Sequence, residues 1–161
     1  MPLSPHDLRG SFEASVRKRF GFLTAEFSFQ YCSTNVDEDW RDGYLRVRYV
    51  RSSCVVDIFV TSITLAVYVV VRRGAPIQNV PCSEWSTDSG IDVEEYLLQH
   101  HKDELGPPLP EMKGAVVFKT FMERHLRRYM SIAASNLDGI IKVHADRLRL
   151  FAPEILSAVC P

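Results

Sequence analysis

Residues 44–72 read YLRVRYVRSSCVVDIFVTSITLAVYVVVR, and this stretch decides the fold. It holds three runs rich in β-branched and aromatic residues, which two short polar breaks separate. In the first run Leu45, Val47 and Tyr49 alternate with Arg46 and Arg48, which predicts a strand with one buried and one solvated face. The breaks have the length of hairpin turns, so the pattern predicts a three-stranded antiparallel meander. The runs are residues 44–51, 54–60 and 64–72.

The second run places Asp57 and Phe59 on the face opposite Ile58, and the third run is apolar on both faces. The third strand is therefore expected to be central, or covered on its second face. A sheet with one buried face needs helices packed on it. We expect residues 1–161 to form a single α+β domain. Its antiparallel meander sheet would have about four or five strands, with an N-terminal helix and C-terminal helices packed on one face.

Composition narrows the class of protein. A chain of 161 residues can bury the core of one domain, and 46% hydrophobic and 24% charged residues are typical of globular proteins. The formal net charge of −1 gives the molecule no strong attraction to nucleic acid or anionic membranes. The longest uncharged apolar run, residues 63–71, is much shorter than the roughly 20 residues that span a bilayer. The start, MPLSPHDLRG, lacks the pattern of a secretory signal.

The cysteines are scattered along the chain, and none forms a CxxC pair. This spacing favours free thiols over disulfides, and free thiols persist in a reducing cytosol. We therefore expect a cytoplasmic protein with four unpaired cysteines, of which Cys54 would be buried in its strand as a small hydrophobic residue. The four are Cys32, Cys54, Cys82 and Cys160.

The N-terminal helix has recognisable ends. Ser4 and Pro5 suit its first positions, and Gly21 suits its end. Phe12, Val16 and Phe20 recur at i, i+4 spacing and form its apolar stripe. The next residues, 22–31, alternate imperfectly and predict a first strand that pairs with the meander.

An acidic segment that contains a tryptophan lies just before the meander. Carboxylates crowd around Trp40 in residues 36–43, VDEDWRDG, and the Asp-Gly pair at its end predicts a turn. One interpretation is a solvated connection whose Trp40 packs against the sheet edge. The other is a partner-binding loop, because tryptophan often anchors interfaces and carboxylates would suit a basic partner. The spacing does not fit a calcium loop, and we expect no metal. The candidate partner-binding residues are Asp37, Glu38, Asp39, Trp40, Asp42 and, in the long connection of residues 73–91, Trp85.

The second helix begins at a capping box, with Asp92 as N-cap and Glu95 at the third position. It carries His100 and His101 beside carboxylates, which raises the question of a metal site. Adjacent helical residues point about 100° apart, and His100 with Glu104 would supply only two ligands. A solvated helix face is the better interpretation, and no cofactor is expected.

Residues 111–135 and 140–156 follow the helical period, and residues 136–139 predict a break between them. The inner stripe of the last helix includes His144, which we interpret as a core histidine. Lysine and arginine dominate this region, whereas carboxylates dominate residues 84–104. A nucleic-acid surface would use Lys119, Arg124, Arg127 and Arg128, but no known nucleic-acid motif accompanies them, and we do not expect this partner.

The order of these elements resembles a known group. An amphipathic helix ending at RFGF, the meander LRVRYV…VVDIFV…LAVYVVVR, the capped helix IDVEEYL and a long helical pair resemble small bacterial proteins of the kind that provide immunity against polymorphic toxins. The resemblance covers about Asp7 to Phe151 and lies in the order and residue types of the elements, with no catalytic motif to match. It implies a cytoplasmic, non-enzymatic protein that acts by binding.

Two function classes follow. The first is a protein-binding module, an immunity-type inhibitor that would cover a basic site on a partner such as a toxin domain. The second is a small enzyme or ligand-binding protein with a cleft between sheet and helices. Its candidate groups would be His100, Glu104, His125 and His144, and it requires at least two of them to converge in one pocket. The sequence favours the first class and leaves the oligomeric state open.

Overall fold

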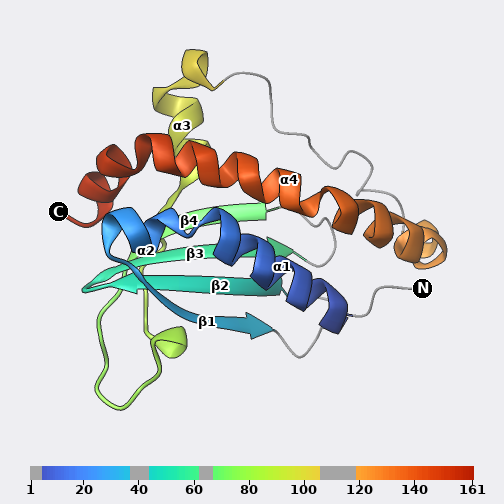
Figure 1. Cartoon of the computed structure of the whole chain (residues 1–161), viewed down its shortest axis with the longest axis horizontal. Helices are drawn as coiled ribbons and strands as arrows, with labels where there is room; N and C mark the ends of the chain where they lie inside the picture. The colour runs from blue at the N-terminus through green and yellow to red at the C-terminus, as the bar shows by residue number, and fades with distance from the viewer. Residues whose placement is uncertain (1–4, 37–43, 62–66, 106–118) are drawn as a thin grey trace.

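A computed structural model of the chain describes residues 5–36, 44–61, 67–105 and 119–161. At residues 5–8, 33–36, 44, 61 and 119–135 it describes the backbone alone. The fold over these residues is α+β, as the sequence predicts (Figure 1).

The described strands form one antiparallel sheet in the order β1-β2-β3-β4-β5. Val47, Ile58 and Val69 face one another across the three central strands, so the predicted meander and its buried face are confirmed. The strands are β1 (Gln30–Val36), β2 (Tyr44–Arg51), β3 (Cys54–Thr61), β4 (Val67–Arg73) and the short β5 (Ile91–Asp92).

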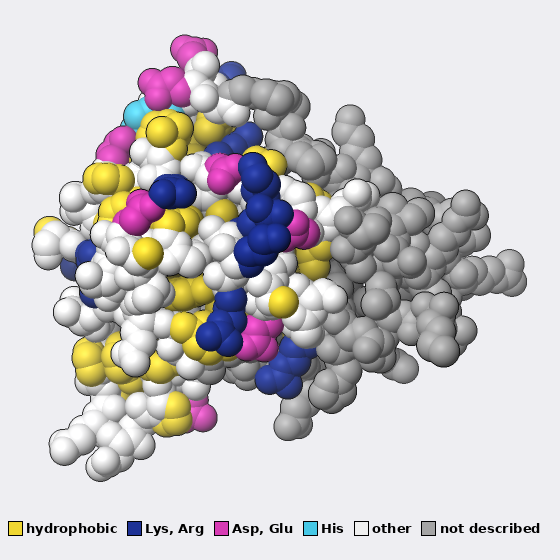
Figure 2. Space-filling model, in the orientation of Figure 1, with side chains coloured by type: hydrophobic (Ala, Val, Ile, Leu, Met, Phe, Trp, Pro, Cys, Tyr) yellow, Lys and Arg dark blue, Asp and Glu magenta, His cyan; other side chains and the backbone are white. Residues whose placement is uncertain are grey.

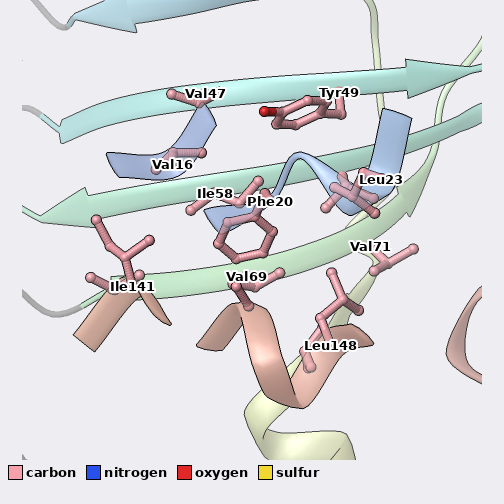
Figure 3. Close-up of a cluster of buried hydrophobic side chains, with 14 of the residues drawn as sticks. Val16, Phe20, Leu23, Val47, Tyr49, Ile58, Val69, Val71, Ile141 and Leu148 are labelled. Carbon is pink, nitrogen blue, oxygen red and sulfur yellow. The ribbon is translucent and has the colours of Figure 1, made fainter. Parts of the chain in front are cut away.

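Helices cover one face of this sheet. Figure 1 shows α1 and α4 crossing the same face, and α4 packs on α1 and β4. Figure 3 shows the resulting core, in which Phe20, just after α1, and Leu148 of α4 meet Ile58 and Val69 from the sheet. The described helices are α1 (Pro5–Arg19), α2 (Phe22–Phe27), α3 (Val93–His100) and α4 (Lys119–Val159), with 3-10 turns η1 (Cys82–Glu84) and η2 (Lys102–Glu104). No described helix is long and apolar enough to cross a bilayer.

The predicted first strand over residues 22–31 is wrong in its first part. Residues Phe22–Phe27 form α2, and the chain turns at Ser28, whose φ of 59° is left-handed, before β1 begins at Gln30. The adjacent residues Phe22 and Leu23 are both buried. A helix can bury two adjacent side chains, whereas a strand with one exposed face sends them to opposite faces. The ring of Phe22 also stacks on Phe20 at 6.0 Å, which ties α2 to the end of α1.

The predicted break at residues 136–139 is also wrong, because α4 runs through it without interruption. The Asp138 carboxylate accepts hydrogen bonds from Ser15 Oγ at 2.5 Å and from Arg19 Nη2 at 2.6 Å. Leu137 and Ile140 are buried on the same segment. These tertiary contacts outweigh the weak helix propensity of Asn136 and Gly139. Pro153 lies inside α4, which continues to Val159.

The prediction of four free thiols is wrong. Cys32 bonds to Cys82 and Cys54 bonds to Cys160, with Cα–Cα distances of 6.1 and 5.7 Å. No cysteine remains free. Cys54 is buried, as expected, but as half of a disulfide that fastens β3 to the end of α4.

Candidate functional site

The face of the sheet that points away from α1 and α4 is the candidate site, and we call it the outer face. The sequence predicts this face to be solvated at residues 44–51, whereas the third run is expected to be central or covered on it. In the structure, a loop covers part of the outer face and leaves an aromatic pair partly exposed at one end. The outer face carries Arg46, Arg48, Val50, Val55, Asp57, Phe59, Tyr68, Val70 and Arg72.

A buried ion pair lies at the centre of the outer face. Arg48 and Asp57 are opposite each other on β2 and β3. Arg48 Nε and Nη2 donate to the two Asp57 oxygens at 2.7 and 2.9 Å, and both side chains are 3% exposed or less. Arg72 Nε lies 3.4 Å from Asp57 Oδ2 but makes no hydrogen bond. The prediction that Arg48 faces water is therefore wrong, because another part of the chain lies over it.

Residues 74–90 provide that covering, and we call them the cover loop. Figure 1 draws this loop in green, extending past β1 and β2 at the bottom of the view. Its main-chain carbonyls accept from the sheet arginines. Arg48 Nη1 donates to Cys82 O at 2.9 Å, and Arg46 Nη2 donates to Ser83 O at 2.8 Å. The disulfide from Cys82 to Cys32 fastens the loop to β1.

Two glycines let the cover loop approach the sheet closely. A Cβ atom on Gly74 would lie 2.9 Å from a methyl group of Val55. Gly90 has a φ of +68°, and a Cβ there would lie 2.5 Å from the carbonyl oxygen of Val71. Gly74 is therefore required because a side chain would not fit, and Gly90 is required both for space and for its left-handed backbone conformation.

The other end of the outer face carries the aromatic pair. Phe59 and Tyr68 face each other on β3 and β4, and their rings stack with centroids 5.3 Å apart and planes 22° from parallel. Tyr68 is 38% exposed. The pair lies in register with Arg46 of β2, near the end where β1 stops at Val36 and β2 starts. This arrangement suits contact with another protein, because exposed aromatic side chains at a sheet end provide rigid apolar area.

Most of the predicted partner-binding residues lie outside the described residues, namely Asp37, Glu38, Asp39, Trp40 and Asp42. Trp85 is described. It follows η1 in the cover loop, is partly buried, and donates its indole N–H to Val80 O at 3.3 Å. Its backbone carbonyl accepts from Arg48 Nη1 at 3.4 Å, which holds this part of the loop over the outer face.

A second polar cluster joins α3 to α4. Glu154 of α4 accepts from Tyr96 Oη at 2.7 Å and pairs with His101 Nε2 at 2.8 Å. His101 Nδ1 also lies 3.3 Å from Glu104. The hydrogen bond to Glu154 raises the pKa of His101, and the same bond lowers the pKa of Glu154. The cluster therefore favours an ionised pair that fastens α3 to α4.

The candidate residues of the enzyme hypothesis whose side chains the structure describes each contact a different group. His100 stacks on Tyr96 at 4.4 Å, and Glu104 pairs with His101. His144 is 6% exposed, and burial lowers its pKa to about 4, so it is a neutral core residue as interpreted. The side chain of His125 lies outside the described residues. Among the described residues no group of three or more potential metal ligands is found.

The basic flank predicted for the last helix is balanced where its side chains are described. Figure 2 shows lysine and arginine side chains beside acidic ones on the helix-covered face. Lys142 pairs with Asp146 at 2.8 Å, and Arg149 pairs with Glu26. The four basic residues considered for nucleic acid, Lys119, Arg124, Arg127 and Arg128, have only their backbone described, within α4.

The sequence did not predict the buried ion pair of Arg48 with Asp57 or the more exposed pair of His101 with Glu154. A signal existed for Arg48–Asp57: a two-residue turn at Ser52 and Ser53 brings residue 48 opposite residue 57. No comparable signal links His101 to Glu154, which a separation of more than fifty residues hides. Comparison of the chain with protein-family models, curated proteins and solved structures found no match.

Proposed function

We propose that this protein is a non-enzymatic protein-binding module that contacts its partner through the aromatic end of the outer face. More specifically, we propose an immunity-type inhibitor that covers a basic site on a toxin domain. The observation that carries the proposal is the stacked pair of Phe59 and Tyr68, which is not enclosed by the core although Tyr68 is a large aromatic residue. Tyrosine is enriched among the residues that dominate interface energies.

Chain connectivity adds support for a basic partner. The acidic segment with Trp40 joins Val36 to Tyr44, and the described backbone of Tyr44 pairs with Thr61, two residues beyond Phe59. Carboxylates near an aromatic anchor would steer a positively charged partner toward it and raise the association rate. The roles of Asp37, Glu38, Asp39, Trp40 and Asp42 are part of this proposal.

The disulfides bear on where the protein works. The expectation of a cytoplasmic location depended on free thiols as well as on the resemblance, and the cysteines are paired. Disulfides persist in oxidising compartments and are rare in the cytosol. We therefore propose that the protein meets its partner in an oxidising compartment.

Site-specific photo-cross-linking in the native cell tests the binding surface. A photoreactive amino acid would replace Tyr68 in one variant and Leu150 in a matched control. Leu150 is 71% exposed on α4, away from the outer face, so the control presents the same reagent on another surface. We expect a defined protein adduct from position 68 that is absent from position 150. Equal adducts from both positions, or none from position 68, would contradict the proposal.

The purified partner then allows an affinity measurement. Tyr68→Ser and Trp40→Ala should each weaken binding by about 10- to 100-fold, the range for loss of an interface anchor. Leu150→Ser should leave the affinity unchanged. Thermal unfolding of each variant shows whether the fold persists, and a variant that loses its fold with no separate effect on binding would count against the proposal.

A further inference from the structure

We propose that the Cys32–Cys82 disulfide is a redox-sensitive clasp, whose reduction releases the cover loop from the outer face while the remaining fold stays intact. The proposal concerns the regulation of the outer face and is independent of which partner binds there.

The two disulfides differ in accessibility. Cys54 is 2% exposed and belongs to the core cluster, and its partner Cys160 at the end of α4 is partly exposed and packs against that cluster. Cys32 and Cys82 are both partly exposed. Cys32 is the extra residue of a β-bulge in edge strand β1, since Tyr31 pairs with Tyr49 and Ser33 already pairs with Arg48. A thiolate attacks an accessible sulfur more readily, so Cys32–Cys82 should be reduced first.

The cover loop has few other attachments to the sheet. Within residues 74–90, which the structure describes completely, only Gly74 is buried. The loop contributes no residue to the main core cluster. Apart from the disulfide, it is held by hydrogen bonds from arginines to its carbonyls and by the exposed pairing of Arg73 with Asp88. Backbone hydrogen bonds join only its two ends to the sheet, from Gly74 N to Ser53 O and from Asp88 N to Arg73 O. A segment with so few buried apolar contacts opens at low free-energy cost once its covalent link is removed.

Opening leaves no buried charge without a partner. Arg48 Nη1 would exchange the carbonyls of the cover loop for water, while its Nε and Nη2 keep both oxygens of Asp57. Val50, Val55 and Val70 would gain exposure on the outer face, but the larger core lies on the opposite face beneath the helices. The sheet can therefore persist in the open state, and the outer face becomes accessible beyond the aromatic pair.

The chemistry balances with a dithiol as reductant. One thiolate of the dithiol attacks a sulfur of the Cys32–Cys82 bond and forms a mixed disulfide, and its second thiolate displaces the protein sulfur. The dithiol is oxidised to a cyclic disulfide, two electrons pass to the protein, and the two cysteine sulfurs take up the two protons.

Graded reduction of the full-length oxidised chain with dithiothreitol tests the clasp. After each step, free thiols are alkylated with iodoacetamide and located by mass spectrometry, and hydrogen exchange is measured on the same samples. We expect Cys32 and Cys82 to be alkylated while Cys54 and Cys160 stay bonded. In that state the amides of residues 74–90 should exchange about tenfold faster or more, which corresponds to about 1.4 kcal/mol of local stability. Exchange in β2, β3 and the inner part of β4 should be unchanged.

The variant Cys32→Ser/Cys82→Ser should reproduce the open state without reductant, and reoxidation of the wild-type chain should restore slow exchange. Simultaneous reduction of all four cysteines, or reduction of Cys54–Cys160 first, would overturn the proposal. Alkylation of Cys32 and Cys82 with unchanged exchange in residues 74–90 would overturn it as well. If the variant fails to fold, the graded reduction of the wild-type chain still decides the question.

Discussion

At the residue scale, the outer face depends on the pairing of Arg48 with Asp57. The alternation in residues 44–51 and 54–60 correctly assigns Arg48 and Asp57 to the face away from the helices. It cannot show that this face is covered, because the cover loop comes from residues that are distant in sequence. A buried ion pair contributes little net stability compared with apolar residues of similar size. Each charge nevertheless offsets the cost of burying the other.

Removing one member of this pair should therefore be costly. We expect Asp57→Asn to lower the free energy of unfolding by about 3–5 kcal/mol, because the buried Arg48 guanidinium loses its counter-charge. Urea denaturation measures the loss. Asp146→Asn is the matched control, since the exposed pair of Lys142 and Asp146 should contribute about 0.5 kcal/mol or less. Similar losses for the two variants would mean that Arg48 and Asp57 are not buried as described.

At the element scale, patterns predict regular elements well and misjudge segments whose structure depends on a neighbour. The capped start of α3 is confirmed, with Asp92 accepting from the Glu95 backbone N–H at 3.0 Å. The first part of the strand predicted over residues 22–31 is wrong, because packing against the core favours α2 there. The break predicted at 136–139 is wrong as well, because the contact of Asp138 with Arg19 supports a continuous α4. Local propensity does not contain that information.

Gly139 gives a prediction for α4. It lies in the helix, and a Cβ atom added there would meet no atom within 4 Å outside the adjacent turns, so alanine fits without strain. We expect Gly139→Ala to raise the free energy of unfolding by about 0.5–1 kcal/mol. Gly90→Ala is the contrasting variant and should destabilise the fold, because its φ is +68°. Stability measured by thermal unfolding checks both, and a destabilised Gly139→Ala variant would argue against a continuous α4.

The contact of α3 with α4 should depend on pH. Glu154 raises the pKa of His101 above its ordinary value of 6.5, so the stabilisation by His101 is complete below that value and is lost as pH rises through the raised pKa. Glu154 has a lowered pKa, so its contribution is lost as pH falls below its ordinary value of 4.5. The contact should be strongest between these limits.

An NMR titration of the His101 ring measures this effect. We expect a midpoint above 6.5 in the wild-type protein and a lower midpoint in Glu154→Gln, which removes the negative partner. His144 serves as an internal control, because burial keeps its midpoint well below that of an exposed histidine. An unchanged His101 midpoint in Glu154→Gln would refute the assigned pair.

At the scale of the whole molecule, the sequence predicts the α+β class, the meander and the helix-covered face, because these follow from hydrophobic periodicity. It does not predict the disulfide pairing, since scattered cysteines are compatible with several connectivities and with none. The cover loop depends on that pairing and on glycines that allow close approach. The covered state of the outer face thus depends on long-range contacts, which no single segment reveals.

Hydrogen exchange of the protein alone and in complex with its cross-linked partner tests the central claim most directly. Amides around Phe59 in β3 and Tyr68 in β4 should exchange more slowly in the complex, while those of α1 and of the described C-terminal half of α4 should be unchanged. Slower exchange confined to α1 and α4, with no change around Phe59 and Tyr68, would contradict the claim that the outer face is the binding surface.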